Sequence, residues 1–225
     1  MIRTFNYEIF RSYPQLYCAS YWRDREESDA ELSLAELSFF QKAAVARAEQ
    51  VHGAGIRPVK YPGMQPDCDG LISSEADLAL LIRTADCAPL MFFHPGNNVI
   101  ANVHAGWRGI HAGIVDEAIR QLSENFNSPA AGLRIAVGTF IRECCYEVGP
   151  EFGNYFPPEF FVKNNGKQHL NLQAALQHSF LRNGIDLSLV EFSGECTCCS
   201  RQNFPSYRRN HTKDRILNLI VRSSS

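Results

Sequence analysis

The stretch Asn102-Val103-His104-Ala105-Gly106-Trp107-Arg108-Gly109 lies between an apolar run and a segment with an amphipathic pattern. The run at 99–104 follows a turn sequence, His94-Pro95-Gly96-Asn97-Asn98, and its composition predicts a strand. Residues 110–126 repeat apolar side chains at helical spacing. The segment therefore predicts a strand that leads into a helix, with His104 at the junction.

Predicted elements of both kinds lie on either side of this segment. Short apolar runs predict strands at residues 70–73, 78–83, 90–93, 133–137, 187–192 and 215–221. Helical spacing predicts one helix over 34–49, ended near Gly53 and Gly55, and another over 171–182, ended by Asn183-Gly184. Because strands and helices do not alternate regularly and no linker divides the chain, we expect one α+β domain over residues 1–225.

The composition and net charge limit the classes of protein to which the chain can belong. The chain has 225 residues, of which 45% are hydrophobic and 20% charged, as in a globular protein with a substantial core. Its net charge of −2 favours neither nucleic acid nor an anionic membrane as partner. No apolar run is long enough to span a bilayer, and the N-terminal residues do not read as a signal peptide. We expect a cytoplasmic protein, and the sequence leaves its oligomeric state open.

Three residues with metal-binding side chains stand at the ends of predicted elements. His52 follows the first predicted helix, Cys87 follows the strand at 78–83, and His104 ends the strand at 99–104. Catalytic zinc keeps three such protein ligands and an open fourth position. If these side chains converge, they predict a catalytic zinc site. Copper clusters need many histidines, and this chain has seven, without an H-x-H pair, so copper fits less well than zinc.

A second interpretation makes Cys87 a nucleophile. A thiolate paired with an imidazolium is intrinsically reactive, so His104 would serve as the base. Asp86, the residue before Cys87, would then orient the histidine. The two interpretations use the same residues and differ in the role of Cys87.

Both interpretations use Cys87 alone, and the chain has seven other cysteines. Without a secretory signal, free thiols or metal ligands are favoured over disulfides. The cysteines are residues 18, 68, 87, 144, 145, 196, 198 and 199. A second, thiolate-rich metal site is conceivable from Cys144, Cys145, Cys196, Cys198 and Cys199. Because their spacing lacks the paired C-x-x-C of structural zinc modules, inert thiols are the favoured interpretation.

Four arginines are candidate anion binders, because a guanidinium matches phosphate or carboxylate with two parallel hydrogen bonds. They are Arg83, Arg108, Arg208 and Arg209. For most of them a surface ion pair is an equally simple interpretation. Arg108 differs, because it precedes a predicted helix start at 109–110, and helix starts attract anions.

Five motifs in one order resemble a known family. They are Q-V-H-G at 50–53, T-A-D-C at 84–87, H-A-G-W-R-G at 104–109, C-C-Y-E-V-G at 144–149 and S-Y-R-R at 206–209. The chain is similar, from about Gln41 to its C-terminal strand, to the laccase-domain or "polyphenol oxidase" family of YfiH-like proteins. Members are also described as purine nucleoside phosphorylases and as peptidoglycan editing factors.

The resemblance implies a layered α/β/β/α fold with mixed sheets and a single zinc on His52, Cys87 and His104. It implies phosphorolysis of adenosine, inosine and methylthioadenosine to a free base and ribose 1-phosphate, with adenosine deamination as a side activity. Purine nucleoside and phosphate are then the partners, with Arg83, Arg108 and Arg208 as substrate-binding residues. Cys87, His104 and Asp86 are the expected catalytic residues, and Asp69 is the other nearby carboxylate.

The family's editing role implies an alternative. The chain would then be an amidase that removes an amino acid from a UDP-muramyl precursor, using Cys87 and His104. A metal-bound scaffold that binds a nucleotide without turnover is a third interpretation. The chain departs from the family's usual motifs at Tyr21-Trp22-Arg23-Asp24-Arg25, at Gly138-Thr139 and at Thr212-Lys213-Asp214-Arg215. These departures concern the shape of the substrate pocket and leave the predicted metal ligands unchanged.

Overall fold

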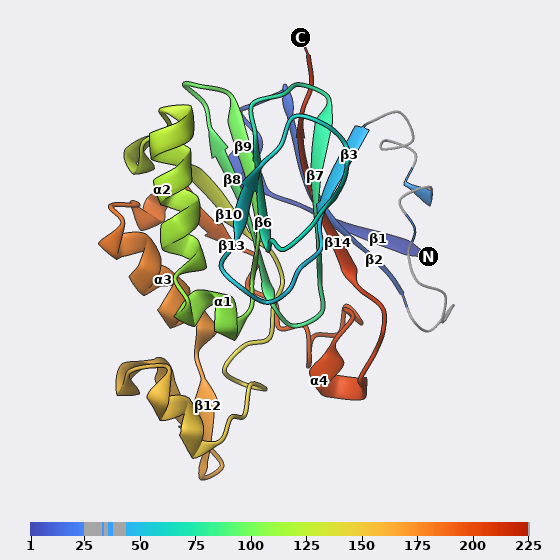
Figure 1. The fold of residues 1–225 in the computed structure, drawn as a ribbon. Coiled ribbons are helices and arrows are strands. Elements are labelled where there is room, and N and C mark those ends of the chain that lie inside the picture. The colour runs from blue at the N-terminus through green and yellow to red at the C-terminus, as the bar shows by residue number, and fades with distance from the viewer. Residues whose placement is uncertain (25–32, 34–35, 38–43, 225) are drawn as a thin grey trace.

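Two six-stranded mixed sheets lie face to face in the computed structural model, which describes residues 1–24, 33, 36–37 and 44–224 (Figure 1). The first sheet has the order β1 (Ile2–Asn6), β2 (Leu16–Arg23), β14 (Ile216–Arg222), β7 (Leu78–Thr84), β3 (Ala44–Ala48), β5 (Gly63–Gln65). The second has the order β13 (Val190–Phe192), β10 (Arg134–Val137), β8 (Ala88–His94), β9 (Val99–Ala105), β6 (Gly70–Ser73), β4 (Ile56–Pro58). A separate hairpin joins β11 (Phe161–Asn164) to β12 (Lys167–Leu170).

The second sheet is buried on both faces, which explains its continuous apolar sequences. On β8, Leu90 and Phe92 pack toward the helices, while Met91 and Phe93 pack toward the first sheet. All four side chains are 0% exposed. Burial of each such side chain contributes about 1.5–3 kcal/mol to the free energy of unfolding. The same alternation on β9 places Asn102 and His104 on the face toward the first sheet.

Helices cover the outer face of the second sheet. In Figure 1, α2 (Ile114–Phe126) and α3 (Leu172–Arg182) lie side by side on that face, next to the short α1 (Trp107–His111). A fourth helix, α4 (Tyr207–Asn210), lies near the end of the sheets. Short 3-10 helices occupy Glu8–Phe10, Ala130–Gly132, Pro150–Asn154, Pro158–Phe160 and Leu187–Leu189. Within the described residues, no helix has the length and apolar composition to cross a membrane.

The α+β fold with mixed sheets is confirmed, and so are the strands at 70–73, 78–83, 90–93, 99–104, 133–137 and 215–221 to within one or two residues. The helix predicted over 34–49 is wrong at its end, where residues 44–48 form β3. Most of its other residues lie outside the described part of the chain. Ala46 and Ala48 point into the space between the sheets, and β3 pairs in parallel with β7. This pairing outweighs the helix propensity of alanine.

Two other predicted elements are divided. The helix at 110–126 becomes α1 and α2, because Gly113 adopts a φ of 83° and interrupts the helical backbone. The strand at 187–192 begins as a 3-10 turn, and only Val190–Phe192 pairs with β10. Neither difference moves His104, which lies on β9 as predicted.

Buried amides connect the two sheets. The Asn102 side-chain amide on β9 donates to the carbonyls of Leu80 on β7 and Asn218 on β14, each at 2.9 Å. The Asn218 side chain, itself 0% exposed, accepts from the Ser20 hydroxyl at 2.6 Å. Polar side chains at buried positions need such partners, and those of the Asn102 amide lie on the opposite sheet.

Candidate metal centre and substrate pocket

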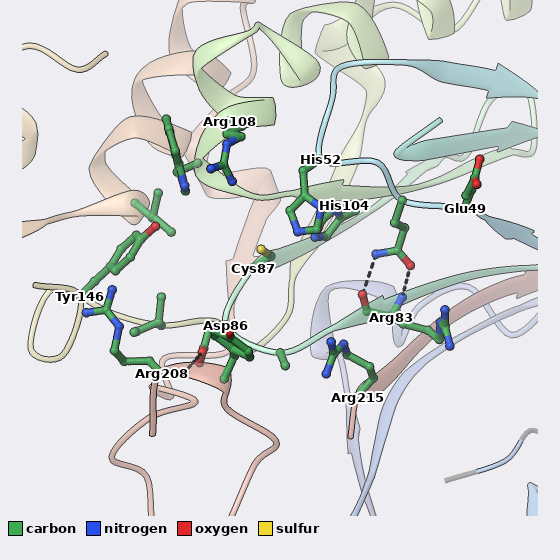
Figure 2. Close-up of a pocket in the computed structure, with 16 residues that line it drawn as sticks. Glu49, His52, Arg83, Asp86, Cys87, His104, Arg108, Tyr146, Arg208 and Arg215 are labelled. Atoms are coloured by element: carbon green, nitrogen blue, oxygen red, sulfur yellow. Dashed lines mark hydrogen bonds between the residues drawn. The ribbon is translucent and has the colours of Figure 1, made fainter. Parts of the chain in front are cut away.

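His52, Cys87 and His104 converge at one end of the two sheets (Figure 2). One ligand atom from each lies within 4.8 Å of the other two. His52 lies in the loop after β3, Cys87 in the turn between β7 and β8, and His104 on β9. The three side chains range from exposed at His52 to buried at His104. The set is therefore anchored in the core and open on one side.

The backbone around these side chains is strained. Gln50, His52 and Asp86 adopt left-handed φ values of 67°, 62° and 82°. The Gln50 side chain holds this geometry by donating to the carbonyl of Arg83 at 2.6 Å and accepting from its amide at 2.9 Å. Left-handed backbone at residues other than glycine is unfavourable and is often found at functional sites.

At two positions of the H-A-G-W-R-G motif, neighbouring atoms lie so close to the backbone that only glycine fits. A Cβ at Gly106 would lie 3.0 Å from the Cys87 sulfur, and one at Gly109 would lie 2.7 Å from the Gly53 carbonyl oxygen. The second contact is with backbone, which cannot rotate away. These glycines allow α1 to pack against the loop that carries His52.

Asp69 holds the buried histidine. Its Oδ1 lies 2.8 Å from His104 Nδ1, and Asp69 also accepts from the amides of His52 and Gly53 at 2.9 and 2.7 Å. With Nδ1 engaged, Nε2 of His104 is the nitrogen available to a metal ion, an arrangement typical of metal-binding histidines. The donor set and its spacing thus fit a metal ion. The alternative in which Asp86 orients His104 is wrong, because Asp69 makes that contact.

The pKa values of Cys87 and His104 both differ from their usual values. Burial would raise the pKa of the Cys87 thiol, but hydrogen bonds with His104 and His52 outweigh it and lower this pKa to about 6. Burial would likewise lower the pKa of His104, but Asp69 and Cys87 raise it to about 9. Without a metal, the two groups therefore form a thiolate–imidazolium pair near neutral pH.

A cavity of about 550 Å³ opens above the three side chains, a volume within the usual range for small-molecule sites. Arginines and aromatic or apolar side chains form its walls. The arginines are Arg83, Arg108, Arg208 and Arg215, and the aromatic and apolar side chains are Trp107, Ile141, Tyr146, Leu172 and Tyr207. Glu49 and Asp86 are the acidic residues among the described lining residues. The pocket is thus rich in positive charge.

Asp86 and Arg208 are linked by hydrogen bonds. Asp86 accepts from the Arg208 amide at 2.7 Å and from the Thr197 hydroxyl at 2.6 Å. The Arg208 guanidinium donates to the carbonyls of Cys145 and Glu147 at 3.3 and 2.8 Å. Asp86 therefore positions the start of α4 and the arginine on it. Arg209 does not line the pocket, because its guanidinium donates to the carbonyls of Thr197, Cys198 and Phe204.

Arg108 lies inside α1, which begins at Trp107 and not at the predicted 109–110. Its guanidinium stacks on the Trp107 ring at 4.5 Å. Sequence reasoning missed Tyr146, Trp107 and Arg215 as pocket residues. Tyr146 and Trp107 stand within the motifs C-C-Y-E-V-G and H-A-G-W-R-G, which was the available signal. Arg215 carried no such signal.

The comparisons with known proteins agree on one family. A family model described as multi-copper polyphenol oxidoreductase laccase matches residues 12–223. A purine nucleoside phosphorylase of Aquifex aeolicus is 36% identical over 157 residues, which are 68% of this chain and 70% of that protein. The purine nucleoside phosphorylase YlmD of Geobacillus stearothermophilus is 31% identical over 208 residues, covering 84% of this chain and 76% of YlmD. The crystal structure of YlmD has a TM-score of 0.85 at 25% identity, covering 97% of this chain and 94% of that chain.

Proposed function

Since the chain belongs to the multi-copper polyphenol oxidoreductase laccase family, we propose that it is a zinc-dependent purine nucleoside phosphorylase. Relatives named as purine nucleoside phosphorylases support an enzyme. The observation that carries the proposal is the convergence of His52, Cys87 and His104 at a pocket lined by four arginines. The substrates are adenosine, inosine or methylthioadenosine with phosphate.

His52, Cys87 and His104 would hold the zinc. When bound, zinc supplies Lewis-acid chemistry, polarising a substrate oxygen or activating a water molecule. One thiolate and two imidazoles are ligands that zinc accepts. Asp69 fixes the orientation of His104 through Nδ1. Zinc is favoured over a copper cluster, because His52 and His104 are the histidines among the described lining residues.

The arginines bind phosphate. Arg83, Arg108 and Arg208 offer guanidinium donors to an anion, with Arg215 beside them. In phosphorolysis a phosphate oxygen bonds to C1′ of the ribose while the bond from C1′ to the base nitrogen breaks. The electron pair of that bond leaves with the base. Fixing phosphate against C1′ supplies most of the rate through positioning and charge stabilisation.

The aromatic wall binds the purine. Trp107, Tyr146 and Tyr207 provide flat apolar surfaces against which a purine ring packs, next to Ile141 and Leu172. Asp86 acts as a positioning residue, because its carboxylate holds the Arg208 amide. Adenosine deamination is a side activity of the same pocket, in which water adds to the purine carbon that bears the amino group and the C–N bond to that group breaks, releasing ammonia.

The decisive experiment is inosine turnover by protein of measured zinc content, with and without phosphate, following hypoxanthine release. We expect release that requires phosphate and is lost when zinc is removed. His104→Ala should lose both metal and turnover. The matched control is His178→Ala, an exposed histidine on α3, which should retain both. Phosphate-dependent release by metal-free His104→Ala would contradict the proposal.

One observation favours a second function. Cys87, His104 and Asp69 form a thiolate–histidine–carboxylate series, the arrangement of a cysteine nucleophile with its base. An amidase acting on a UDP-muramyl-amino acid precursor would use it. Amino-acid release without phosphate or metal supports this candidate, while its absence under saturating precursor argues against it.

A further inference from the structure

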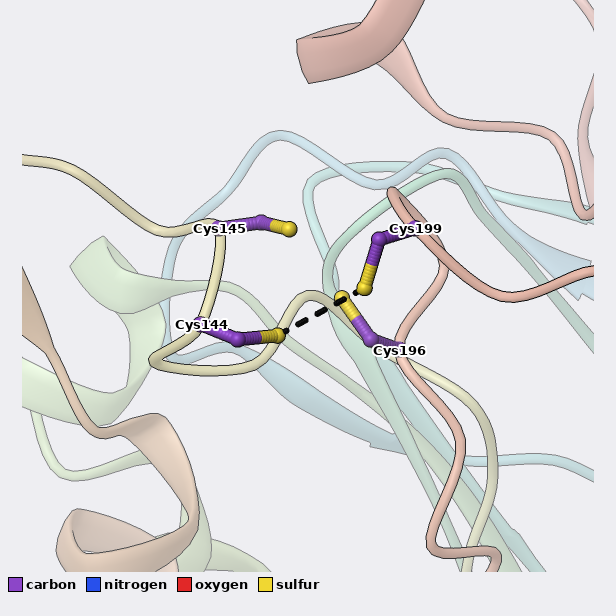
Figure 3. Close-up of side chains that lie close together, drawn as sticks. All are labelled: Cys144, Cys145, Cys196 and Cys199. Carbon is purple, nitrogen blue, oxygen red and sulfur yellow. Dashed lines mark hydrogen bonds between the residues drawn. The ribbon is translucent and has the colours of Figure 1, made fainter.

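Four cysteine sulfurs that do not belong to the set of His52, Cys87 and His104 lie close together (Figure 3). Cys144 and Cys145 come from one turn, and Cys196 and Cys199 from another about fifty residues later. All four Sγ atoms lie within 4.8 Å of one another, and those of Cys144 and Cys199 are 3.6 Å apart. We propose that these four cysteines form a second metal site, a tetrathiolate site for a structural zinc ion.

The spacing fits one tetrahedral ion. A Zn–S distance of about 2.3 Å places the sulfurs of a tetrahedral site about 3.8 Å apart. The observed separations require shifts of an ångström or less to reach that value. An iron–sulfur cluster needs wider separation, because its iron and sulfide atoms lie between the thiolates. A disulfide would use two of the four sulfurs and leave the convergence of the others unexplained.

Backbone amides point at the sulfur of Cys196, the buried member of the set. The Arg142 amide donates to Cys196 Sγ at 3.4 Å, and the amides of Cys198 and Cys199 donate to the same sulfur. Amide donors around a thiolate are the outer-shell contacts that orient metal ligands. Cys144 and Cys199 are exposed, so an ion reaches the cluster from solvent.

Two arginines bind the backbone of the cysteine turns. Arg208 donates to the Cys145 carbonyl, and Arg209 donates to the carbonyls of Thr197 and Cys198. Four thiolates around a divalent ion carry a net charge of −2, which nearby guanidinium groups offset. The surroundings therefore suit an anionic metal–thiolate centre.

The two turns that carry the four cysteines also form hydrogen bonds with residues that line the pocket. The turn with Cys145 supports Arg208, and the turn with Cys196 carries Thr197, which donates to Asp86. An ion shared by the two turns fixes their separation. The cluster thus positions one wall of the pocket without touching the substrate.

Metal stoichiometry tests the proposal. Wild-type protein purified under reducing conditions should hold two zinc ions per chain. Cys144→Ser/Cys199→Ser changes two exposed side chains and should hold one, while Cys87→Ala should also hold one because it retains the tetrathiolate site. Cys198→Ser is the matched control, since Cys198 lies in the same turn but outside the four-sulfur set, and it should hold two. Because Cys87→Ala removes the pocket ligand only, the outcome is independent of the proposed phosphorylase activity.

Cobalt provides a second measurement. Cobalt-loaded Cys87→Ala should show intense thiolate-to-cobalt charge-transfer absorption, which Cys144→Ser/Cys199→Ser/Cys87→Ala should lose. A zinc content of one per wild-type chain, abolished by Cys87→Ala, would overturn the proposal. So would a Cys144–Cys199 disulfide found by mass spectrometry in protein purified with reductant.

Discussion

The Nδ1 atom of His104 lies 2.8 Å from Oδ1 of Asp69, and these side chains are 3% and 0% exposed. Asp69→Asn keeps the shape but removes the charge that stabilises the histidine orientation. We expect metal affinity to fall by about 10- to 100-fold, as for other outer-shell partners of metal ligands. Titration with a competing chelator measures this affinity.

Asp67→Asn is the control for that experiment, because Asp67 is exposed and lies two residues away. It should leave metal affinity unchanged. Equal affinities for Asp69→Asn and wild type would show that Asp69 does not support the site.

Gly109→Ala should destabilise the protein. Its Cβ would lie 2.7 Å from the Gly53 carbonyl, so α1 must move away from the loop that carries His52. We expect a loss of about 1–3 kcal/mol in the free energy of unfolding, as for other overpacked sites, together with weaker metal binding. Denaturant unfolding measures the loss. Gly153→Ala, where an added Cβ has no neighbour within 4 Å, should cost much less.

Arg208→Lys tests the proposed binding of phosphate by the arginines of the pocket. Lysine keeps the charge but lacks the planar fork, so contacts to the Cys145 and Glu147 carbonyls and to phosphate are lost. We expect the KM for phosphate to rise about tenfold or more, the size of a lost charged hydrogen bond. Arg120→Lys, on the exposed face of α2, should leave it unchanged. A change in the KM for inosine alone would place Arg208 elsewhere in the pocket.

The reactivity of Cys87 should depend on pH in metal-free protein. Burial would raise its pKa, but hydrogen bonds with His104 and His52 lower it to about 6. Alkylation of Cys87, followed by mass spectrometry, should therefore reach half its plateau near pH 6, against about 8.5 for an unperturbed thiol. Because the pKa of Cys87 is lower in the folded protein than in the unfolded chain, its thiolate contributes fully to the free energy of unfolding above the unfolded pKa. This contribution is lost as the pH falls through about 6.

His104→Ala provides the comparison for the pH measurement. It removes one hydrogen bond that lowers the pKa, so the alkylation midpoint should shift to higher pH. An unchanged midpoint would mean that His104 does not control the thiol.

Much of the second sheet was predictable from sequence, because its strands are buried on both faces. The runs Leu90–Phe93 and Val99–His104 are almost continuously apolar, and the turn between them is rich in proline, glycine and asparagine. The strand β3 was not predictable. Its alanines favour a helix locally, and pairing with β7, some thirty residues away, decides their conformation.

The three proposed metal ligands were found because each follows or ends an element, where side chains are held firmly. Their convergence depends on how the sheets stack, which the sequence does not specify. Asp69 and Asp86 illustrate this limit. Asp86 is adjacent to Cys87 in sequence, yet Asp69 is the carboxylate that reaches His104. The convergence of the four cysteines is not evident from the sequence for the same reason, because two turns far apart in sequence bring them together.

The amide of Asn102 bridges the two sheets by donating to strands β7 and β14. These bonds resist sliding of one sheet past the other, because a slip would leave a buried amide without partners. His52 follows a strand of the first sheet, whereas His104, two residues beyond Asn102, lies on the second. Resistance to shear between the sheets therefore sets the distance between the two histidines, and Asn102 acts as a spacer for a site that it does not touch.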